Sequence, residues 1–230
     1  MFRLELQPAY IIHARAYRDT SLLVDLFTPE YGRVGAVVRG VRVKKSPRRA
    51  LMNPFIPLLV SLQGRSALKL LTHAETAGAN LNLQGVSLFS GLYLNELLLR
   101  LLPEWDAHAD LYDDYVEALT SLAQPGPVEP VLRRFEAALL QAMGYQMDYA
   151  CDAETQQPLV AGHLYRLEPG HGFVASASGS FPGEILLAID RGDYGHEQVC
   201  RLAKHINRQL LAPLLGTRPL QSRLLFARPE

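Results

Sequence analysis

A short basic segment carries the clearest chemical signal in this sequence. Between residues 39 and 49, six of eleven side chains are Lys or Arg and none is acidic. Clustered cations neutralise nucleic-acid phosphates and release counterions, which gives sequence-independent affinity that falls with salt. Arginine adds stacking on bases and bidentate contact with phosphate. Gly40 and Pro47 suit an irregular loop, so we expect a nucleic-acid contact on a mobile connection; the alternative is a solvated loop without a ligand.

The distribution of charge along the chain supports a polyanionic partner for one part only. The net charge is zero, but residues 1–80 hold twelve Lys/Arg against five Asp/Glu, and residues 81–230 hold eleven against eighteen. Such asymmetry is typical of a chain with one nucleic-acid-binding region. The candidate DNA-binding residues are Arg15, Arg18, Arg33, Arg39, Arg42, Lys44, Lys45, Arg48 and Arg49.

Four aromatic residues in the same region could stack on bases if they face outward. They are Tyr10, Tyr17, Phe27 and Tyr31. Phe27 stands in an apolar run and is expected in the core. Tyr17 and Tyr31 stand beside arginines and are the better candidates.

The elements that must position these residues are short strands. Runs rich in apolar and β-branched residues, separated by turn signals, cover residues 10–16, 20–27, 33–38, 55–62 and 68–72. Pro54 and Pro57 place the start of the fourth strand at an edge or a bulge. Five short strands in such a span indicate a small barrel, and the five-stranded OB barrel, which binds oligonucleotides, is one such fold.

After residue 80 the apolar period becomes helical. Three stripes mark helices, namely Leu88, Leu92, Leu99 and Leu102; Leu111, Tyr115, Leu119 and Leu122; and Leu132, Phe135, Leu139 and Met143. Residues 145–182 indicate loops with a hairpin around 163–174, and two more helices are expected near 184–190 and 197–211. The sequence therefore predicts an α+β protein with a barrel domain at 1–80 and a mainly helical domain at 81–230.

Composition and missing motifs exclude several classes of protein. Hydrophobic residues make up 48% and charged residues 20%, which excludes a disordered chain. Two cysteines, an N-terminus without an apolar signal region and an interrupted apolar run at 92–102 favour a cytoplasmic protein. The GxxxxGK[ST], GxGxxG, GxSxG and HExxH motifs are absent. The close acidic residues Asp106, Asp110, Asp113 and Asp114 are expected on a solvated helix face, so no enzyme is predicted.

Several segments, in order along the chain, resemble the RecO family of bacterial recombination mediators. In the N-terminal part these are YRDTSLLVDLFT at 17–28, GRV at 32–34, RGVR at 39–42 and NPFIPL at 53–58. In the helical part they are YLNELL at 93–98, LRRFE at 132–136 and MGY at 143–145. The C-terminal segment LGTRPLQSRLLF at 215–226 completes the resemblance. Together they cover nearly the whole chain.

The resemblance implies a fold, an activity and partners. The fold would be an OB-fold barrel followed by a helical domain. The activity would be binding to single- and double-stranded DNA and annealing of complementary strands without nucleotide hydrolysis or a cofactor. The partners would be RecR, the tail of the single-strand DNA-binding protein (SSB) and, indirectly, RecA, in the bacterial cytoplasm at the nucleoid.

One feature departs from the family pattern. Many members hold zinc with two CxxC pairs in the helical domain, but here only Cys151 stands in that region and Cys200 lies far along the chain. His163 and His171 could join them on paper, but no pair has ligand spacing. We therefore expect a degenerate zinc-finger-like insertion at 145–182 without metal, and a buried thiol at Cys151.

An SSB tail, which is acidic and ends in a Phe carboxylate, needs an apolar pocket with a cation at its lip. Arg133 or Arg134 could supply the cation, and Phe135, Leu139 and Tyr145 could line the pocket. The alternative is that both arginines face water and the apolar residues fill the core.

Two other functions are open at this point. An OB-fold RNA-binding factor would carry the same basic loop, because phosphates do not identify the nucleic acid. A protein-interaction adaptor without direct nucleic-acid binding could use the basic loop to bind an acidic protein.

Overall fold

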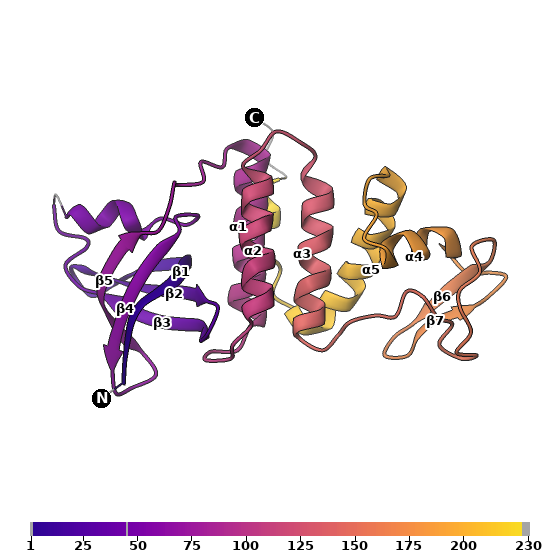
Figure 1. Cartoon of the computed structure of the whole chain (residues 1–230), viewed down its shortest axis with the longest axis horizontal. Coiled ribbons are helices and arrows are strands. Elements are labelled where there is room, and N and C mark those ends of the chain that lie inside the picture. Colours follow the sequence, from indigo (N-terminus) through magenta and orange to yellow (C-terminus); the bar gives the residue numbers. More distant parts are fainter. Residues whose placement is uncertain (1, 45, 227–230) are drawn as a thin grey trace. The chain divides into compact units, whose positions relative to one another are not determined.

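The computed structural model describes residues 2–44 and 46–226, and they fold into two compact units. The first unit is Met1–Val128 with Thr217–Glu230, and the second is Glu129–Gly216. Three helices from the region after residue 80 therefore group with the N-terminal strands in the first unit. Figure 1 shows the strands, followed along the chain by the helical region.

Five strands form the closed N-terminal barrel that the sequence predicts, in the order β1-β2-β3-β5-β4. They are β1 (Phe2–Tyr17), β2 (Ser21–Thr28), β3 (Gly32–Val38), β4 (Leu58–Gly64) and β5 (Lys69–Thr76). The β3–β5 pair is parallel and the other pairs are antiparallel. β1 begins earlier than expected, because its first half pairs with β4 and its second half with β2. Register shifts within β1 bend it from one neighbour to the other.

Side-chain alternation on β2 and β3 separates the core from the outer face of the barrel. Val24 and Leu26 belong to the barrel core, and so do their cross-strand partners Ala36 and Val34. The intervening residues, such as Leu23, therefore point outward, since successive strand residues face opposite sides. This register fixes which side chains a ligand on the outer face can reach.

The basic connection between β3 and β4 is partly ordered by the barrel core. It contains a 3-10 helix, η1 (Pro47–Met52), whose last residue Met52 is buried in the barrel core, as is Val41 before the helix. β4 starts at Leu58, three residues later than expected. Phe55 has a positive φ of 67°, and its ring packs against Gly91. The contact is so close that a Cβ added to Gly91 would lie 2.8 Å from the ring. The apolar run before β4 thus contacts a helix instead of extending the strand.

Three helices complete the first unit: α1 (Gly85–Leu101), α2 (Ala109–Leu122) and the short α6 (Ser222–Leu225). The barrel meets α2 through four rings, with Tyr10 and Phe27 each 5.4–6.0 Å from Tyr112 and Tyr115 between ring centroids. Such tilted and edge-on pairs stabilise beyond their buried area. Burial raises the pKa of Tyr115 well above its ordinary value, and its hydroxyl donates to Asn95 at 2.6 Å.

A carboxylate on α1 holds the start of α6. Glu96 accepts hydrogen bonds from the Ser222 hydroxyl at 2.6 Å and from the backbone N–H groups of Gln221 and Ser222 at 2.8 Å each. Burial alone would raise the pKa of Glu96, but the bonds from Ser222 and Gln221 outweigh it and hold the pKa below its ordinary value. Negative charge at a helix N-terminus is favourable, so this contact fixes the C-terminal segment on α1.

The second unit combines three helices with a small sheet. They are α3 (Val128–Ala142), α4 (Gly183–Asp190) and α5 (Glu197–Leu215), with strands β6 (Leu164–Glu168), β7 (Gly172–Ala175) and β8 (Phe181–Pro182) in the order β7-β6-β8. The β6–β7 pair is the hairpin expected around 163–174. Phe173 and Phe181 anchor its core against Leu186 and Ile206. α5 is longer than expected, because it continues through Pro213.

An aspartate organises part of the 145–182 segment, for which the sequence predicts a degenerate zinc-finger-like insertion. The buried carboxylate of Asp152 accepts from the backbone N–H groups of Glu154, Thr155 and Ala175 and from the Thr155 hydroxyl, at 2.7–3.1 Å. The Thr155 N–H lowers the pKa of Asp152 most; burial opposes it, and the Ala175 bond adds to it, with a net lowering. The Asp152 carboxylate, together with the Ala153 N–H that donates to the Phe173 carbonyl at 2.8 Å, thus ties the 152–155 turn to β7.

Candidate nucleic-acid interface

Most of the predicted DNA-binding residues are exposed side chains of the barrel and its loops. Arg15 lies on β1 opposite Leu23, whose side chain points outward from the barrel. The exposed members of the predicted set are Arg15, Arg18, Arg39, Arg42, Lys44, Arg48 and Arg49. Lys45 lies outside the described residues. Exposed cations of this number give the barrel a surface that can neutralise phosphates.

Hydrogen bonds hold two of the basic segments together at one end of the barrel. Arg42 donates from its backbone N–H to the Thr20 carbonyl at 2.9 Å and from Nη1 to the Arg18 carbonyl at 3.0 Å. The loop after β3 is therefore fixed against the β1–β2 turn. The exposed guanidinium of Arg18 lies 5.3 Å from the centroid of the Tyr17 ring.

The 3-10 helix places further charge beside β5. Arg48 donates from Nη2 to the Thr72 carbonyl at 3.3 Å, and Arg49 follows it in η1 as an exposed residue. The sequence predicts a mobile loop between β3 and β4. In the structure this connection packs apolar residues into the barrel core, and its basic side chains are exposed.

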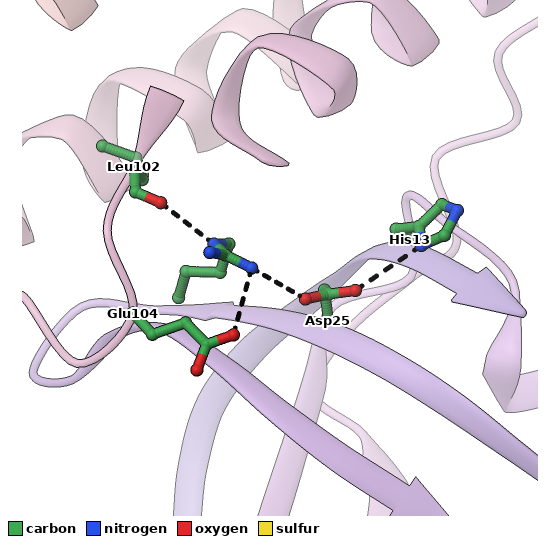
Figure 2. Close-up of polar contacts among 5 residues, drawn as sticks. His13, Asp25, Leu102 and Glu104 are labelled. Carbon is green, nitrogen blue, oxygen red and sulfur yellow. Dashed lines mark hydrogen bonds and ion pairs between the residues drawn. The ribbon is translucent and has the colours of Figure 1, made fainter. Parts of the chain in front are cut away.

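Arg33 has a structural role in this fold, which corrects its prediction as a DNA contact. Its side chain is only 17% exposed, and Nη1 lies 3.0 Å from Asp25 and 3.4 Å from Glu104. Its Nε donates to the Leu102 carbonyl at 3.0 Å. Figure 2 shows Asp25, Leu102 and Glu104 converging on this one guanidinium, with His13 on the far side of Asp25. Arg33 therefore fastens the α1–α2 connection to the barrel.

Of the four aromatic candidates, only Tyr17 lies with the exposed basic residues. Tyr10 and Phe27 are buried under α2, as the apolar context of Phe27 suggested. Tyr31 packs against the barrel core and meets Trp105 edge-on at 6.5 Å. Tyr17 is partly exposed and pairs across the strands with Ser21.

The residues predicted from the sequence leave out basic and apolar side chains of the β4–β5 loop and of the start of β5. Arg65 is exposed in this loop, and Leu68 is 39% exposed. Lys69 is 7% exposed, lies over the Trp105 ring at 4.7 Å and donates to the Ser66 carbonyl. The available signal was the fold itself, because OB barrels bind oligonucleotides with this loop and the adjacent strands.

The tail pocket predicted on α3 is not formed by the residues proposed for it. Arg133 is buried, with Nη2 2.9 Å from Glu136 Oε1, and that pair is joined by Asn207, which donates to Glu136 Oε2 at 3.0 Å. Phe135 and Leu139 are in the core, at 1% and 0% exposure. The prediction that these three residues form an accessible pocket was therefore wrong, because α3 turns them inward.

Two members of the predicted tail site remain accessible within the second unit. Arg134 is exposed, with its guanidinium 5.8 Å from the Tyr194 ring centroid. Tyr145 is 50% exposed and lines a cavity of about 470 Å³. Met147, Phe173 and other apolar groups share this lining with the amides of Gln146, Gln156 and Gln209.

The two cysteines are free thiols that lie in different settings. Cys200 is buried and its Sγ donates to the Tyr194 carbonyl at 3.2 Å. Cys151 is only partly buried, which corrects the expectation of a buried thiol. Over the described residues, no cluster of three or more His, Cys, Asp or Glu side chains could hold a metal ion.

The acidic residues at the start of α2 form the solvated face that the sequence predicts. Asp110 and Asp113 are exposed on α2, Asp114 is partly buried, and Asp106 is exposed in the connection before the helix. Burial, and then the neighbouring carboxylates led by Glu117, raise the pKa of Asp114. In the part of the chain that the structure describes, no helix combines the length and apolarity needed to cross a membrane.

Comparison with known proteins places this architecture in one family. The model for the N-terminal part of recombination protein O matches residues 1–80, and the model for its C-terminal part matches residues 83–191. A DNA repair protein RecO from Cellvibrio japonicus (strain Ueda107) is 52% identical over 229 residues, which is 97% of each chain. The RecO protein of Stutzerimonas stutzeri (strain A1501) is 47% identical over 96% of this chain and 92% of its own. That of Haemophilus influenzae (strain 86-028NP) is 43% identical over 96% and 95%.

These matches run over nearly the full length of both chains, and the N-terminal one covers the barrel that carries the exposed arginines. The chain belongs to the RecO family of DNA repair proteins.

Proposed function

We propose that this protein is a non-enzymatic recombination mediator that binds single- and double-stranded DNA and anneals complementary strands. With RecR, it would help to load RecA on SSB-coated single strands in the cytoplasm, at the nucleoid. The observation that carries the proposal is the exposed set of cations at one end of the barrel, where Arg42 joins the β1–β2 turn to the basic connection. Membership of a DNA repair family supports DNA as the polyanion.

The chemistry of annealing needs no catalytic residue. Two complementary strands repel each other through their phosphates, and a surface that neutralises both lets their bases meet. The exposed side chains of Arg15, Arg39, Lys44 and Arg49 can contact phosphates without giving up an ion pair that the fold requires. The energy of pairing comes from the strands themselves, so no nucleotide hydrolysis is required.

An acidic protein tail is the second ligand that we propose, on the second unit. The tail of SSB would place its carboxylate near an exposed cation and its aromatic end on apolar surface. Arg134 and Tyr145 are the predicted residues that remain exposed for these two roles. Titration of a labelled tail peptide against Arg134→Ala and Tyr145→Ala variants tests this, and unchanged affinity in both would reject it.

Annealing of SSB-coated complementary strands without ATP, followed by fluorescence against salt, tests the main proposal. We expect fast annealing that fades as salt rises. Changing Arg42, Lys44, Arg48 and Arg49 to Ala removes up to four phosphate contacts, so the slope of log affinity against log salt on single strands should fall by up to about 3. The matched control changes four exposed arginines of the second unit to Ala: Arg166, Arg191, Arg201 and Arg208.

The outcomes separate the competing functions. Equal loss in the control variant would show that the barrel is not the DNA surface. Preference for RNA over DNA of the same sequence would favour an RNA-binding factor. Failure to bind bare strands at low salt would leave a protein-interaction adaptor as the better account.

A further inference from the structure

An apolar row crosses the outer face of the barrel between its basic segments. Strand register places Arg15 opposite Leu23, Leu23 opposite Val37 and Val37 opposite Leu70. Leu23 and Val37 are outside the barrel core and only partly buried. Outward positions of a barrel strand are usually polar when they face water. Apolar side chains here therefore suggest a ligand with an apolar face.

The β4–β5 loop adds a third apolar side chain to this row. A Cβ placed on Gly35 would lie 3.6 Å from Leu68 Cδ1, so the Leu68 side chain leans over β3 beside Val37. Leu68 is 39% exposed, although it contacts the sheet in this way. The loop thus forms one edge of a shallow apolar strip made of Leu23, Val37 and Leu68.

Cations and one aromatic ring border this strip. Arg15 ends the row on β1, Tyr17 and Arg18 follow at the β1–β2 turn, and Arg65 lies in the β4–β5 loop. A basic border around apolar surface complements a strand whose phosphates lie outside and whose bases are free to pack inward. A duplex offers the phosphates but keeps its base faces stacked inside, so it cannot fill the strip.

We propose that Leu23, Val37 and Leu68, with Tyr17 at their edge, form a base-contact strip that makes this protein favour unpaired strands. This inference rests on the proposed function, since it assumes DNA binding at the barrel. The strip reads no sequence, because every base presents an apolar face. Phosphate contacts from the basic residues serve both kinds of DNA, and the strip adds affinity for single strands only.

Removal of the bases from the ligand tests the strip directly. A 30-nucleotide dT strand and an abasic strand of the same length carry the same phosphates, so they share the electrostatic contribution to binding. We expect the protein to bind the dT strand about tenfold more tightly, which corresponds to stacking of one or two bases. Fluorescence anisotropy with end-labelled strands at fixed salt measures both affinities.

The matching variant combines Leu23→Thr and Val37→Thr, which place β-branched side chains suited to strands at both positions, with Leu68→Ser. It should bind the dT strand about tenfold less tightly, and its affinity for the abasic strand and for a 30-base-pair duplex should change less than twofold. Unchanged abasic affinity also shows that the barrel is folded. A control variant, Val86→Thr with Leu224→Ser, changes apolar residues that are 54% and 56% exposed on helices, and should bind as the unmodified protein does.

Different results would overturn different statements. Equal affinity of the unmodified protein for the dT and abasic strands would reject the base-contact strip but leave phosphate binding intact. Equal losses on all three ligands in the strip variant would also reject it, because the strip would then only support the fold. No binding to any strand at low salt would reject the proposed function itself.

Discussion

Replacement of Arg133 by Met should unfold the second unit at a much lower denaturant concentration. The Arg133 side chain is 3% exposed and its partner Glu136 is 2% exposed, with 2.9 Å between Nη2 and Oε1. Glu129 extends the network from one turn earlier, at 3.7 Å from the same nitrogen, and Lys204 on α5 donates to Glu129 at 2.7 Å. α3 and α5 thus share a charge network in which Arg133 and Glu136 are buried, and Glu129 and Lys204 are partly exposed.

The magnitude follows from the charge that remains. Arg133→Met keeps most of the side-chain volume but leaves the Glu136 carboxylate buried without the cation that it faces. Removal of one partner from a buried pair costs about 3–5 kcal/mol. Removal of both, as in Arg133→Met with Glu136→Leu, should recover most of that loss, since an apolar pair of similar volume replaces a desolvated ion pair at little net cost.

Two optical probes can assign the loss to the correct unit. Trp105 is the one tryptophan in the sequence and belongs to the first unit, so its fluorescence reports the barrel and its helices. Far-UV circular dichroism reports helices of both units. In urea, Arg133→Met should shift a circular dichroism transition to lower concentration and leave the Trp105 transition near its original midpoint.

If Arg133→Met lowered the free energy of unfolding by less than about 1 kcal/mol, the structural role of Arg133 would be refuted, since exposed ion pairs contribute only that much to stability. A double variant as unstable as the single one would refute the charge argument and point to packing instead. A folded Arg133→Met protein should also bind the SSB tail normally, because a buried guanidinium cannot meet a peptide.

Two further results are expected. Asp152→Asn should cost about 1–3 kcal/mol, because the amide cannot accept every bond that Thr155 and Ala175 donate. Because the pKa of Asp152 is lowered in the folded protein, the stability that its carboxylate contributes is complete above the ordinary pKa of 3.8 and is lost as the pH falls below it. The free energy of unfolding of the variant, measured by urea titration, should therefore change less between pH 5 and 2. Lys69→Met should change the fluorescence of Trp105, because the ammonium lies 4.7 Å over that ring, and Lys69→Arg should restore it; identical spectra for all three proteins would contradict the contact.

The barrel could be predicted because its strands alternate and turn signals separate them. The limits of two strands could not, because they depend on distant partners. The first half of β1 is a strand because it pairs with β4, whose residues lie about fifty to sixty positions later. The run before β4 was predicted as strand, yet Phe55 leaves it to pack beside Gly91 on α1. Local sequence carries neither piece of information.

The candidate site shows the same limit at single residues. Arg33 faces outward from β3, as a DNA contact should, but the α1–α2 connection brings the Leu102 carbonyl and Glu104 onto it from seventy residues away. On α3, Arg133 and Arg134 differ by one residue, and a helix rotates about 100° between them. Glu136 stands three positions after Arg133, and that spacing was the available sign that Arg133 has a partner inside the unit.

Helices cover one end of the outer barrel face and leave the other end accessible to a ligand. At the Phe27 end, α2 covers the outward rings, and at Asp25 the guanidinium of Arg33 joins the sheet to the α1–α2 connection. The next outward residue along β2 is Leu23, where coverage ends and apolar side chains become partly exposed. The basic connection is fixed at that same end, because Arg42 bonds the β1–β2 turn. The strand register, the exposure of Leu23 and the contacts of Arg42 are three separate observations, and each points to the same end of the outer barrel face. A ligand bound there need not displace any helix of the first unit.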